Sequence, residues 1–143
     1  MFTKTCEYGI RAVMFVAQKS RPGIKIGVKE IANGINAPEH FVAKVLQDLS
    51  RKGILQSVKG PNGGFYLDDR SKKYTIADVV RAIDGDQLFT RCGLGLKYCS
   101  ARRPCPLHDE FMLIRNQMRE MLERSTVGDF NDELTSGKIY LKR

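Results

Sequence analysis

The sequence predicts a mainly α-helical protein with one small β-hairpin: a winged helix-turn-helix domain followed by a long helix. Three observations support this fold class. Apolar residues recur at helical spacing in residues 5–19 and 28–52, an alternating pattern with turn residues covers 54–67, and a longer helical pattern begins at 107. A chain of 143 residues is long enough for one core with an extension, and too short for two full-sized domains.

The first predicted helix covers residues 5–19 and is expected to lie in the core. Its apolar side chains form one broad stripe, and Thr5 stands where an N-terminal cap is expected. Glu7 lies in the first turn, where a carboxylate suits the positive end of the helix dipole. Cys6 stands apart from the other cysteines, so we expect it to be a small buried residue.

Two short helices joined by a tight turn follow from Val28. The turn contains Gly34 and Asn36, and Pro38 suits the first turn of the second helix. The second helix buries one apolar stripe and leaves a polar face outward, as in the helix-turn-helix that lays a recognition helix in the major groove of DNA. The residues expected to face DNA from this helix are Glu39, His40, Ala43, Lys44, Gln47 and Arg51.

Residues 54–67 predict a β-hairpin directly after this recognition helix, and a helix-turn-helix followed by a hairpin is a winged helix. The tip of the wing is rich in glycine and carries one lysine. Glycine backbone can approach a phosphate or the minor groove closely, although the same composition suits any exposed turn. The expected DNA contacts of the wing are Lys59, Gly60, Pro61, Asn62 and Gly63.

The net charge of +8 is unevenly distributed along the chain. Residues 1–70 carry 11 basic and 6 acidic side chains, residues 71–106 carry 7 and 3, and residues 107–143 carry 6 and 7. The basic surplus therefore lies entirely before His108. This asymmetry favours a polyanionic partner, and together with the fold it predicts double-stranded DNA.

A short helix and a long helix complete the predicted fold. Thr75 and Asp78 have the spacing of a capping box, and the helix that they open ends at Gly85. The long helix shows apolar residues in steps of four and three, which is a heptad-like seam. One exposed helix cannot bury such a seam by itself, so we expect a homodimer, with packing against its own domain as the alternative. The predicted seam consists of Leu107, Phe111, Ile114, Met118 and Leu122.

Three of the four cysteines and one of the two histidines lie between Arg91 and His108. Six residues separate Cys92 from Cys99, five separate Cys99 from Cys105, and His108 follows three positions later. The stretch contains four basic residues and no acidic one, which favours thiolates, and its glycines and prolines suit a loop that folds around one centre. The sequence therefore predicts a metal site.

Other interpretations of this loop remain open. Three cysteines and one histidine are also a common zinc set, although zinc cysteines usually stand in closer pairs. The thiols could also act without metal as a disulfide switch. We do not expect an enzyme or a small-molecule substrate: Cys105 and His108 could form a nucleophile pair, but no phosphate-binding glycine loop or carboxylate pair completes a catalytic set.

The expected organisation has three parts. Residues 1–86 form the winged helix-turn-helix domain, residues 87–108 the cysteine-rich loop, and residues 109–143 the dimerisation helix and a C-terminal tail. No apolar run approaches the roughly 20 residues that span a bilayer, so we expect a cytoplasmic protein with no membrane partner.

The order of these features resembles that of one family, the dimeric winged-helix regulators of bacteria that carry an iron-sulfur cluster, of the IscR/NsrR type. The resemblance covers nearly the whole chain. Its marks are YGIRAV in the first helix, LQDLSRKGIL at the end of the helix-turn-helix, SVKGPNGGFYL in the wing, TIADVVRAIDG in the short helix, and the cysteine loop before the long helix.

The resemblance implies a homodimer that binds a roughly palindromic DNA operator, with a cluster held near the dimer interface. Cys92, Cys99 and Cys105 fall on the family's cysteine ligands. For the fourth ligand, His108 stands where IscR-like members use a histidine, and Glu7 where NsrR-like members use an acidic residue from the other subunit. Either residue could be the fourth ligand, and we favour His108. We also favour a 2Fe-2S cluster over a 4Fe-4S cluster.

The sequence departs from the family on its DNA-binding side. Lys59 stands in the wing where many members have arginine, and Asn62 stands where they have glycine. His40 and Ala43 replace residues that read bases in some members. Because alanine offers at most a methyl contact to thymine, we expect phosphate contacts and DNA shape to supply much of the affinity.

Overall fold

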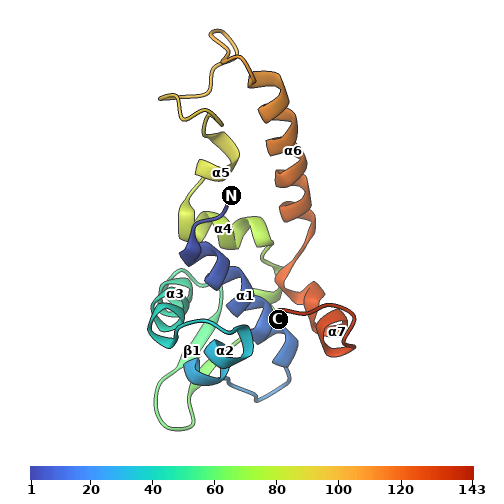
Figure 1. Ribbon diagram of the computed structural model, residues 1–143. Helices are drawn as coiled ribbons and strands as arrows, with labels where there is room; N and C mark the ends of the chain where they lie inside the picture. Colours follow the sequence, from blue (N-terminus) through green and yellow to red (C-terminus); the bar gives the residue numbers. More distant parts are fainter.

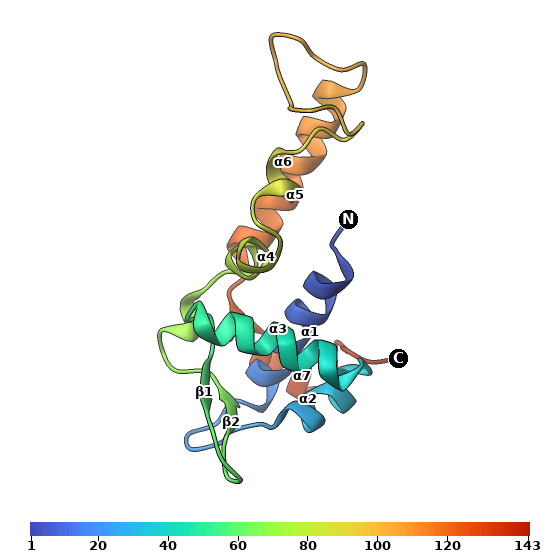
Figure 2. The same cartoon turned by 90° about the vertical axis from the view of Figure 1, so that its left-hand side faces the viewer.

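A helical arm rises from a body of packed helices (Figures 1 and 2). The computed structural model describes the backbone of residues 1–143, and all side chains except those of residues 132 and 133. The elements are α1 (Lys4–Lys19), α2 (Val28–Ile35), α3 (Glu39–Arg51), β1 (Gln56–Val58), β2 (Gly64–Tyr66), the 3-10 turn η1 (Ser71–Lys73), α4 (Ile76–Asp84), α5 (Gln87–Thr90), α6 (His108–Arg124), the 3-10 turn η2 (Val127–Asp129) and α7 (Phe130–Thr135).

Helix α1 runs through the middle of the body, where it contacts α2, α3, α4 and α7. Val13 and Val16 on its inner face are fully buried, as the apolar stripe predicts. The expected cap at Thr5 is wrong. Thr3 precedes the first helical residue, so its hydroxyl can accept a hydrogen bond from the Cys6 N–H (3.1 Å), whereas Thr5 lies inside the first turn.

Helices α2 and α3 form the predicted helix-turn-helix. Asn36 ends α2 in the left-handed conformation, with φ of 53°, which asparagine tolerates better than most side chains do. Pro38 is the cap residue that precedes α3, one position before the first turn in which the sequence places it. The stripe that α3 buries is the predicted one: Val42, Val45, Leu46 and Leu49.

The wing is a two-stranded antiparallel sheet, shorter than the predicted range of 54–67. Ile54 and Leu55 are buried core residues, so the strand begins only after them. An additional bridge joins Ile26 to Phe65 and ties the loop before α2 to the wing, which periodicity did not indicate. The paired residues of the two strands are Gln56 with Tyr66, Ser57 with Phe65 and Val58 with Gly64.

Helices α4 and α7 also pack on α1. The capping box of α4 is formed as predicted, since the Thr75 hydroxyl accepts from the Asp78 N–H (3.0 Å) and the Asp78 carboxylate accepts from the Thr75 N–H (2.9 Å). On α7, the Asn131 side-chain amide donates to the carbonyl oxygen of Ala17 (2.7 Å), which holds α7 on α1.

The arm consists of α5, the cysteine loop and α6. Phe89 of α5 is buried against α6, where Arg119 donates a hydrogen bond to its carbonyl oxygen (3.0 Å). The guanidinium groups of Arg81 and Arg119 lie 4.8 and 5.6 Å from the centre of the Phe89 ring. The one-turn helix α5 was not predicted, because four residues are too few for a periodic pattern. In the part of the chain that the structure describes, no helix is long and apolar enough to cross a membrane.

Candidate functional site

Helix α3, which faces the viewer in Figure 2, carries the residues predicted to meet DNA from this helix. Arg51 at its end forms an ion pair with Asp48 on the same helix (3.0 Å). Ala43 is half-buried, so it presents less surface than its neighbours. The exposed members of the predicted set on this helix are Glu39, His40, Lys44, Gln47 and Arg51.

Phe41 is a feature of this face that the sequence interpretation missed. Its side chain is 50% exposed, although it is large and apolar. Its ring lies 4.1 Å from the His40 ring and stacks 6.2 Å from the ring of Tyr8 on α1. Lys4 and Arg11 in turn lie over the Tyr8 ring. The sequence signal that could have identified Phe41 is its position next to the buried stripe of α3 but outside it.

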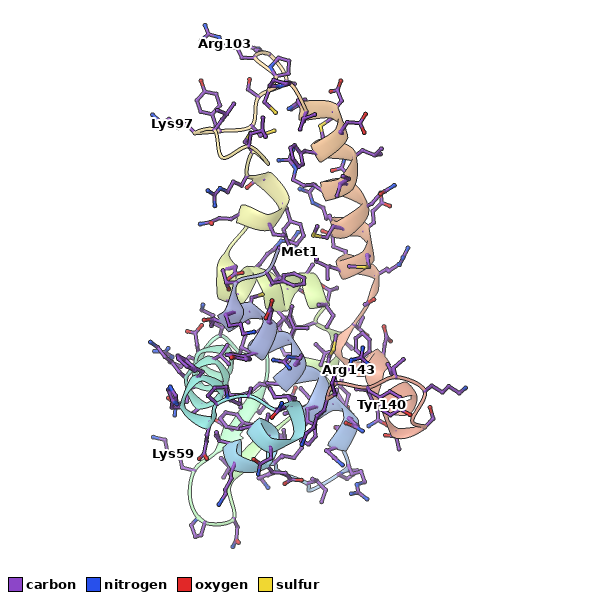
Figure 3. All side chains as sticks on the ribbon, in the orientation of Figure 1. Met1, Lys59, Lys97, Arg103, Tyr140 and Arg143 are labelled. Carbon is purple, nitrogen blue, oxygen red and sulfur yellow. The ribbon has the colours of Figure 1, made fainter. Side chains whose placement is uncertain are left out.

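The wing tip lies at the opposite end of the molecule from the cysteine loop. Figure 3 shows Lys59 at the wing, and Lys97 and Arg103 at the far end of the arm. A hydrogen bond from the Gly63 N–H to the Gly60 carbonyl oxygen (3.0 Å) closes the tip. Of the five predicted wing contacts, all are exposed except Gly63, which is half-buried.

The cysteine loop brings the four predicted ligands together as two pairs, beside the first turns of α6. The Cys105 side chain lies near enough to the Cys92 thiol to lower its pKa, and the Cys99 sulfur lies 3.4 Å from Nδ1 of His108. Among the described residues, no three Cys, His, Asp or Glu side chains are close enough to hold one metal ion. The four predicted ligands therefore lie in two pairs and do not form one set of four among the described residues.

The first pair is arranged to stabilise a thiolate. The pKa of the Cys92 thiol is lowered by the backbone N–H of Leu94, then by that of Leu96, with smaller contributions from the Cys105 thiol and the Gly95 N–H. Burial acts in the opposite direction and is outweighed. Several N–H groups that point at one sulfur favour its anionic form. Cys92 is consequently the cysteine of this loop best prepared to be a ligand or a nucleophile.

Close packing on α6 holds this part of the loop in place. A Cβ on Gly93 would stand 2.6 Å from atoms of the Phe111 ring, so only glycine fits against that ring. Gly95 has φ of 76°, in the left-handed region, and its N–H donates to the Cys92 carbonyl oxygen (2.9 Å). The two glycines make the tight turn that directs N–H groups toward the Cys92 sulfur.

The second pair is held by α6 itself. His108 is the first residue of α6 and is buried, and its Nε2 has no hydrogen-bond partner among the described residues. The Cys99 sulfur accepts a hydrogen bond from Arg115 Nη2 (3.2 Å), and Arg115 also donates to the carbonyl oxygen of Arg91. Sequence reasoning missed Arg115, because a basic side chain on a helix is usually solvated. The signal was its position four residues after Phe111, on the inward face.

Glu7, the alternative fourth ligand, and the separate cysteine Cys6 lie on α1. Glu7 forms an ion pair with Lys4 of the same helix (3.3 Å) and is half-exposed. Cys6 is fully buried, and burial in the first place, then the negative charge of Asp84, raises the pKa of its thiol to about 12. A thiol that stays protonated inside the core fits the packing role expected for Cys6.

The donor set fits an iron-sulfur cluster in its chemistry. Cysteine thiolates are the usual ligands of such clusters, and N–H donors to the ligand sulfurs, as at Cys92 and Cys99, tune them. The buried Nε2 of His108, without a protein partner, provides one further nitrogen donor. A structural zinc ion would accept the same atoms.

Comparisons with known proteins identify the class of molecule. The family model Rrf2, described as an iron-dependent transcriptional regulator, matches residues 2–133. The chain is 32% identical over 131 residues to a protein of Aquifex aeolicus (strain VF5) described as an HTH-type transcriptional regulator, with 90% of each chain covered. It is 28% identical over 141 residues to the HTH-type transcriptional regulator NsrR of Geobacillus kaustophilus (strain HTA426), covering 98% of this chain and 95% of that one.

Among solved structures, CymR, the global cysteine regulator of B. subtilis, matches with a TM-score of 0.73 at 23% sequence identity, over 96% of this chain and 97% of that chain. This likeness confirms the predicted fold class. The relatives named here are transcriptional regulators and not enzymes, which agrees with the expectation from the sequence.

Proposed function

The chain belongs to the Rrf2 family of transcriptional regulators, and we propose that it is a homodimeric regulator whose affinity for DNA is controlled by an iron-sulfur cluster on the cysteine loop. One observation supports this most: His108, which borders the loop, is also the first residue of α6, the helix with the exposed apolar seam. A change at the ligands would therefore act on the helix that joins the two subunits.

The dimer is inferred from the exposed face of α6. Leu107, Ile114 and Met121 stand seven residues apart, and their exposed fractions are 47%, 52% and 46%. A heptad stripe of exposed apolar side chains is typical of a helix that pairs with a second helix. Of the five residues that the sequence assigned to this seam, only Leu107 and Ile114 are exposed. Phe111 and Met118 are half-buried and Leu122 is buried, so Met121 continues the exposed seam.

Cys92, Cys99 and Cys105 would supply the thiolates, and His108 the fourth ligand. Glu7 of a second subunit is the alternative fourth ligand. A cluster bound here would supply a group whose presence and charge depend on iron supply, redox state or nitric oxide. We favour a 2Fe-2S cluster, because a histidine from the same loop completes the ligand set without a second chain.

The winged helix would bind double-stranded DNA as two copies related by the dimer axis. In each copy the exposed face of α3 would enter a major groove, and Lys59 at the wing tip would approach the neighbouring backbone or minor groove. Basic residues dominate this half of the chain, so phosphate contacts are expected to supply much of the affinity.

Selection of binding sites from a pool of random duplexes tests this proposal. We expect a two-fold symmetric sequence with half-sites about 10 base pairs apart, or a multiple of that spacing. Fluorescence anisotropy on the selected duplex would then compare metal-free and anaerobically reconstituted protein, with Cys105→Ser as the control. We expect affinities that differ by at least about tenfold. Equal affinities of the two forms, or selection of single asymmetric half-sites, would contradict the proposal.

A thiol switch is the second candidate, and the nearness of Cys105 to the Cys92 thiol favours it. Two neighbouring thiols, one with a lowered pKa, would close a disulfide when an oxidant removes two electrons and two protons. Mass spectrometry of diamide-treated, metal-free protein separates the two candidates. A Cys92–Cys105 disulfide that alters DNA affinity, in a protein that takes up no iron, would favour the thiol switch.

A further inference from the structure

Two arginines on the inward face of α6 bind the segment opposite it in the arm, which consists of α5 and the start of the cysteine loop. Arg119 donates to the carbonyl oxygen of Phe89 and lies against its ring, which anchors α5. One turn closer to the loop, Arg115 uses one Nη to reach the carbonyl oxygen of Arg91 and the other to reach the Cys99 sulfur. Both arginines are half-buried, and their Nε atoms are fully buried, so each side chain lies partly inside the arm.

We propose that Arg115 is a positioning residue of the cysteine loop, which holds the Cys99 sulfur beside the His108 imidazole before any ligand binds. The inference rests on the proposed function only in taking Cys99 and His108 as ligands. His108 Nδ1 (3.4 Å) and Arg115 Nη2 (3.2 Å) approach the same sulfur, and both belong to α6. Cys99 is thus fixed to the helix by two contacts, although it lies in the middle of a glycine- and proline-rich loop.

The shape of the guanidinium explains why arginine stands at this position. Its planar fork presents donors on two nitrogens at a fixed angle, so one side chain can bridge a backbone carbonyl and a sulfur. A lysine would keep the positive charge but could not span both acceptors in this way. Hydrogen bonds from a charged donor are also about twice as strong as neutral ones.

Two consequences follow. In the reduced, metal-free protein, the segment around Cys99 should be more protected than a free loop of its composition. When a metal binds, the loop should lose less conformational freedom than an unrestrained loop would, so Arg115 should tighten binding. Arg115 remains able to donate to the sulfur once that sulfur is a ligand.

Hydrogen exchange of the reduced, metal-free full-length protein tests the contact directly. Arg115→Gln should increase exchange in residues 96–105 by about tenfold. Arg124→Gln, at the exposed end of the same helix, should leave it unchanged. Unchanged exchange in the Arg115→Gln protein would overturn the proposal.

A double substitution distinguishes positioning of the loop from general damage to α6. If Arg115 acts through the sulfur, then Arg115→Gln should add little to the effect of Cys99→Ala, and Arg115→Lys should restore only part of the protection. A full additional effect in the Cys99→Ala background would show that the sulfur contact is not what holds the loop, and would overturn the proposal.

Anaerobic titration with Co(II) alone gives the second readout, because thiolate-to-cobalt absorption reports binding by the cysteines. Arg115→Gln should weaken Co(II) binding by about tenfold, while Arg124→Gln binds as the natural protein does. Equal Co(II) affinity of all three proteins would overturn the inference about preorganisation. If the natural protein binds no Co(II), the ligand role in the proposed function fails, whereas the exchange result still decides whether Arg115 holds the loop.

Discussion

Replacement of Gly63 with alanine would test the wing at its most constrained point. A Cβ on Gly63 would stand 2.0 Å from the Val58 carbonyl oxygen and 2.9 Å from the carbonyl carbon of Lys59. Both are backbone atoms, so no side-chain rotation relieves the overlap. The two sides of the hairpin must move apart by about 1 Å before the closer contact becomes acceptable.

The cost follows from the contacts that this movement breaks. They are the hydrogen bond from the Gly63 N–H to the Gly60 carbonyl oxygen (3.0 Å) and the last pair of the ladder, Val58 with Gly64. At about 0.5–1.5 kcal/mol for each backbone hydrogen bond, two of them make the closed hairpin about 1–3 kcal/mol less stable. The cost is local, because the wing tip is exposed and contributes nothing to the helical core.

Hydrogen exchange of the amides in residues 57–65 measures this cost, and anisotropy with the selected duplex measures its effect on DNA binding. We expect faster exchange, DNA affinity lower by roughly tenfold, and a thermal midpoint close to that of the natural protein. Gly27→Ala is the matched control, since a Cβ there meets nothing within 4 Å. Hairpin amides as protected in Gly63→Ala as in Gly27→Ala would refute the reasoning.

Three further predictions concern other parts of the fold. Thr75→Ala removes the hydroxyl that accepts from Asp78, so thermal unfolding followed by circular dichroism should show a loss of about 1 kcal/mol, or roughly 4 °C. Folding raises the pKa of the Cys6 thiol from 9.0 to about 12, so the folded protein favours the neutral thiol. The contribution of Cys6 to the free energy of unfolding is therefore complete below pH 9.0 and is lost as the pH rises toward about 12. Urea unfolding should therefore show the stability advantage of the natural protein over Cys6→Ala shrinking between these pH values; a constant difference would contradict this sign. Lys59→Gln should reduce the slope of log affinity for DNA against log salt by about one, measured by anisotropy, whereas an unchanged slope would mean that Lys59 contacts no phosphate.

The helices of the body were predictable because each buries a periodic apolar stripe. The stripe of α3 and the capping box of α4 are examples in which local pattern and tertiary packing agree. The cap at Thr3 shows the limit of the method. Two threonines stand two residues apart, and only the three-dimensional end of the helix decides which hydroxyl meets the free N–H groups.

The cysteine loop was predictable as a ligand-bearing segment but not in its arrangement. Its glycines and prolines carry no periodic signal, so the sequence could not indicate that Cys105 would lie near Cys92 while Cys99 would contact His108. Nor could it reveal that Arg115 turns inward, because periodicity does not distinguish a solvated arginine from one that donates to a sulfur. The exposed seam needed the structure too, since Leu122 and Met121 are neighbours and only packing shows which one is free.

The most direct test of the proposed cluster is the visible absorption spectrum of freshly purified protein kept under anaerobic conditions, with iron, sulfide and zinc assayed on the same sample. The proposal predicts sulfur-to-iron charge-transfer bands, matching amounts of iron and sulfide, and loss of both in Cys92→Ser. A colourless protein with about one zinc ion per chain, or a protein that takes up no iron and sulfide even after anaerobic reconstitution, would contradict it.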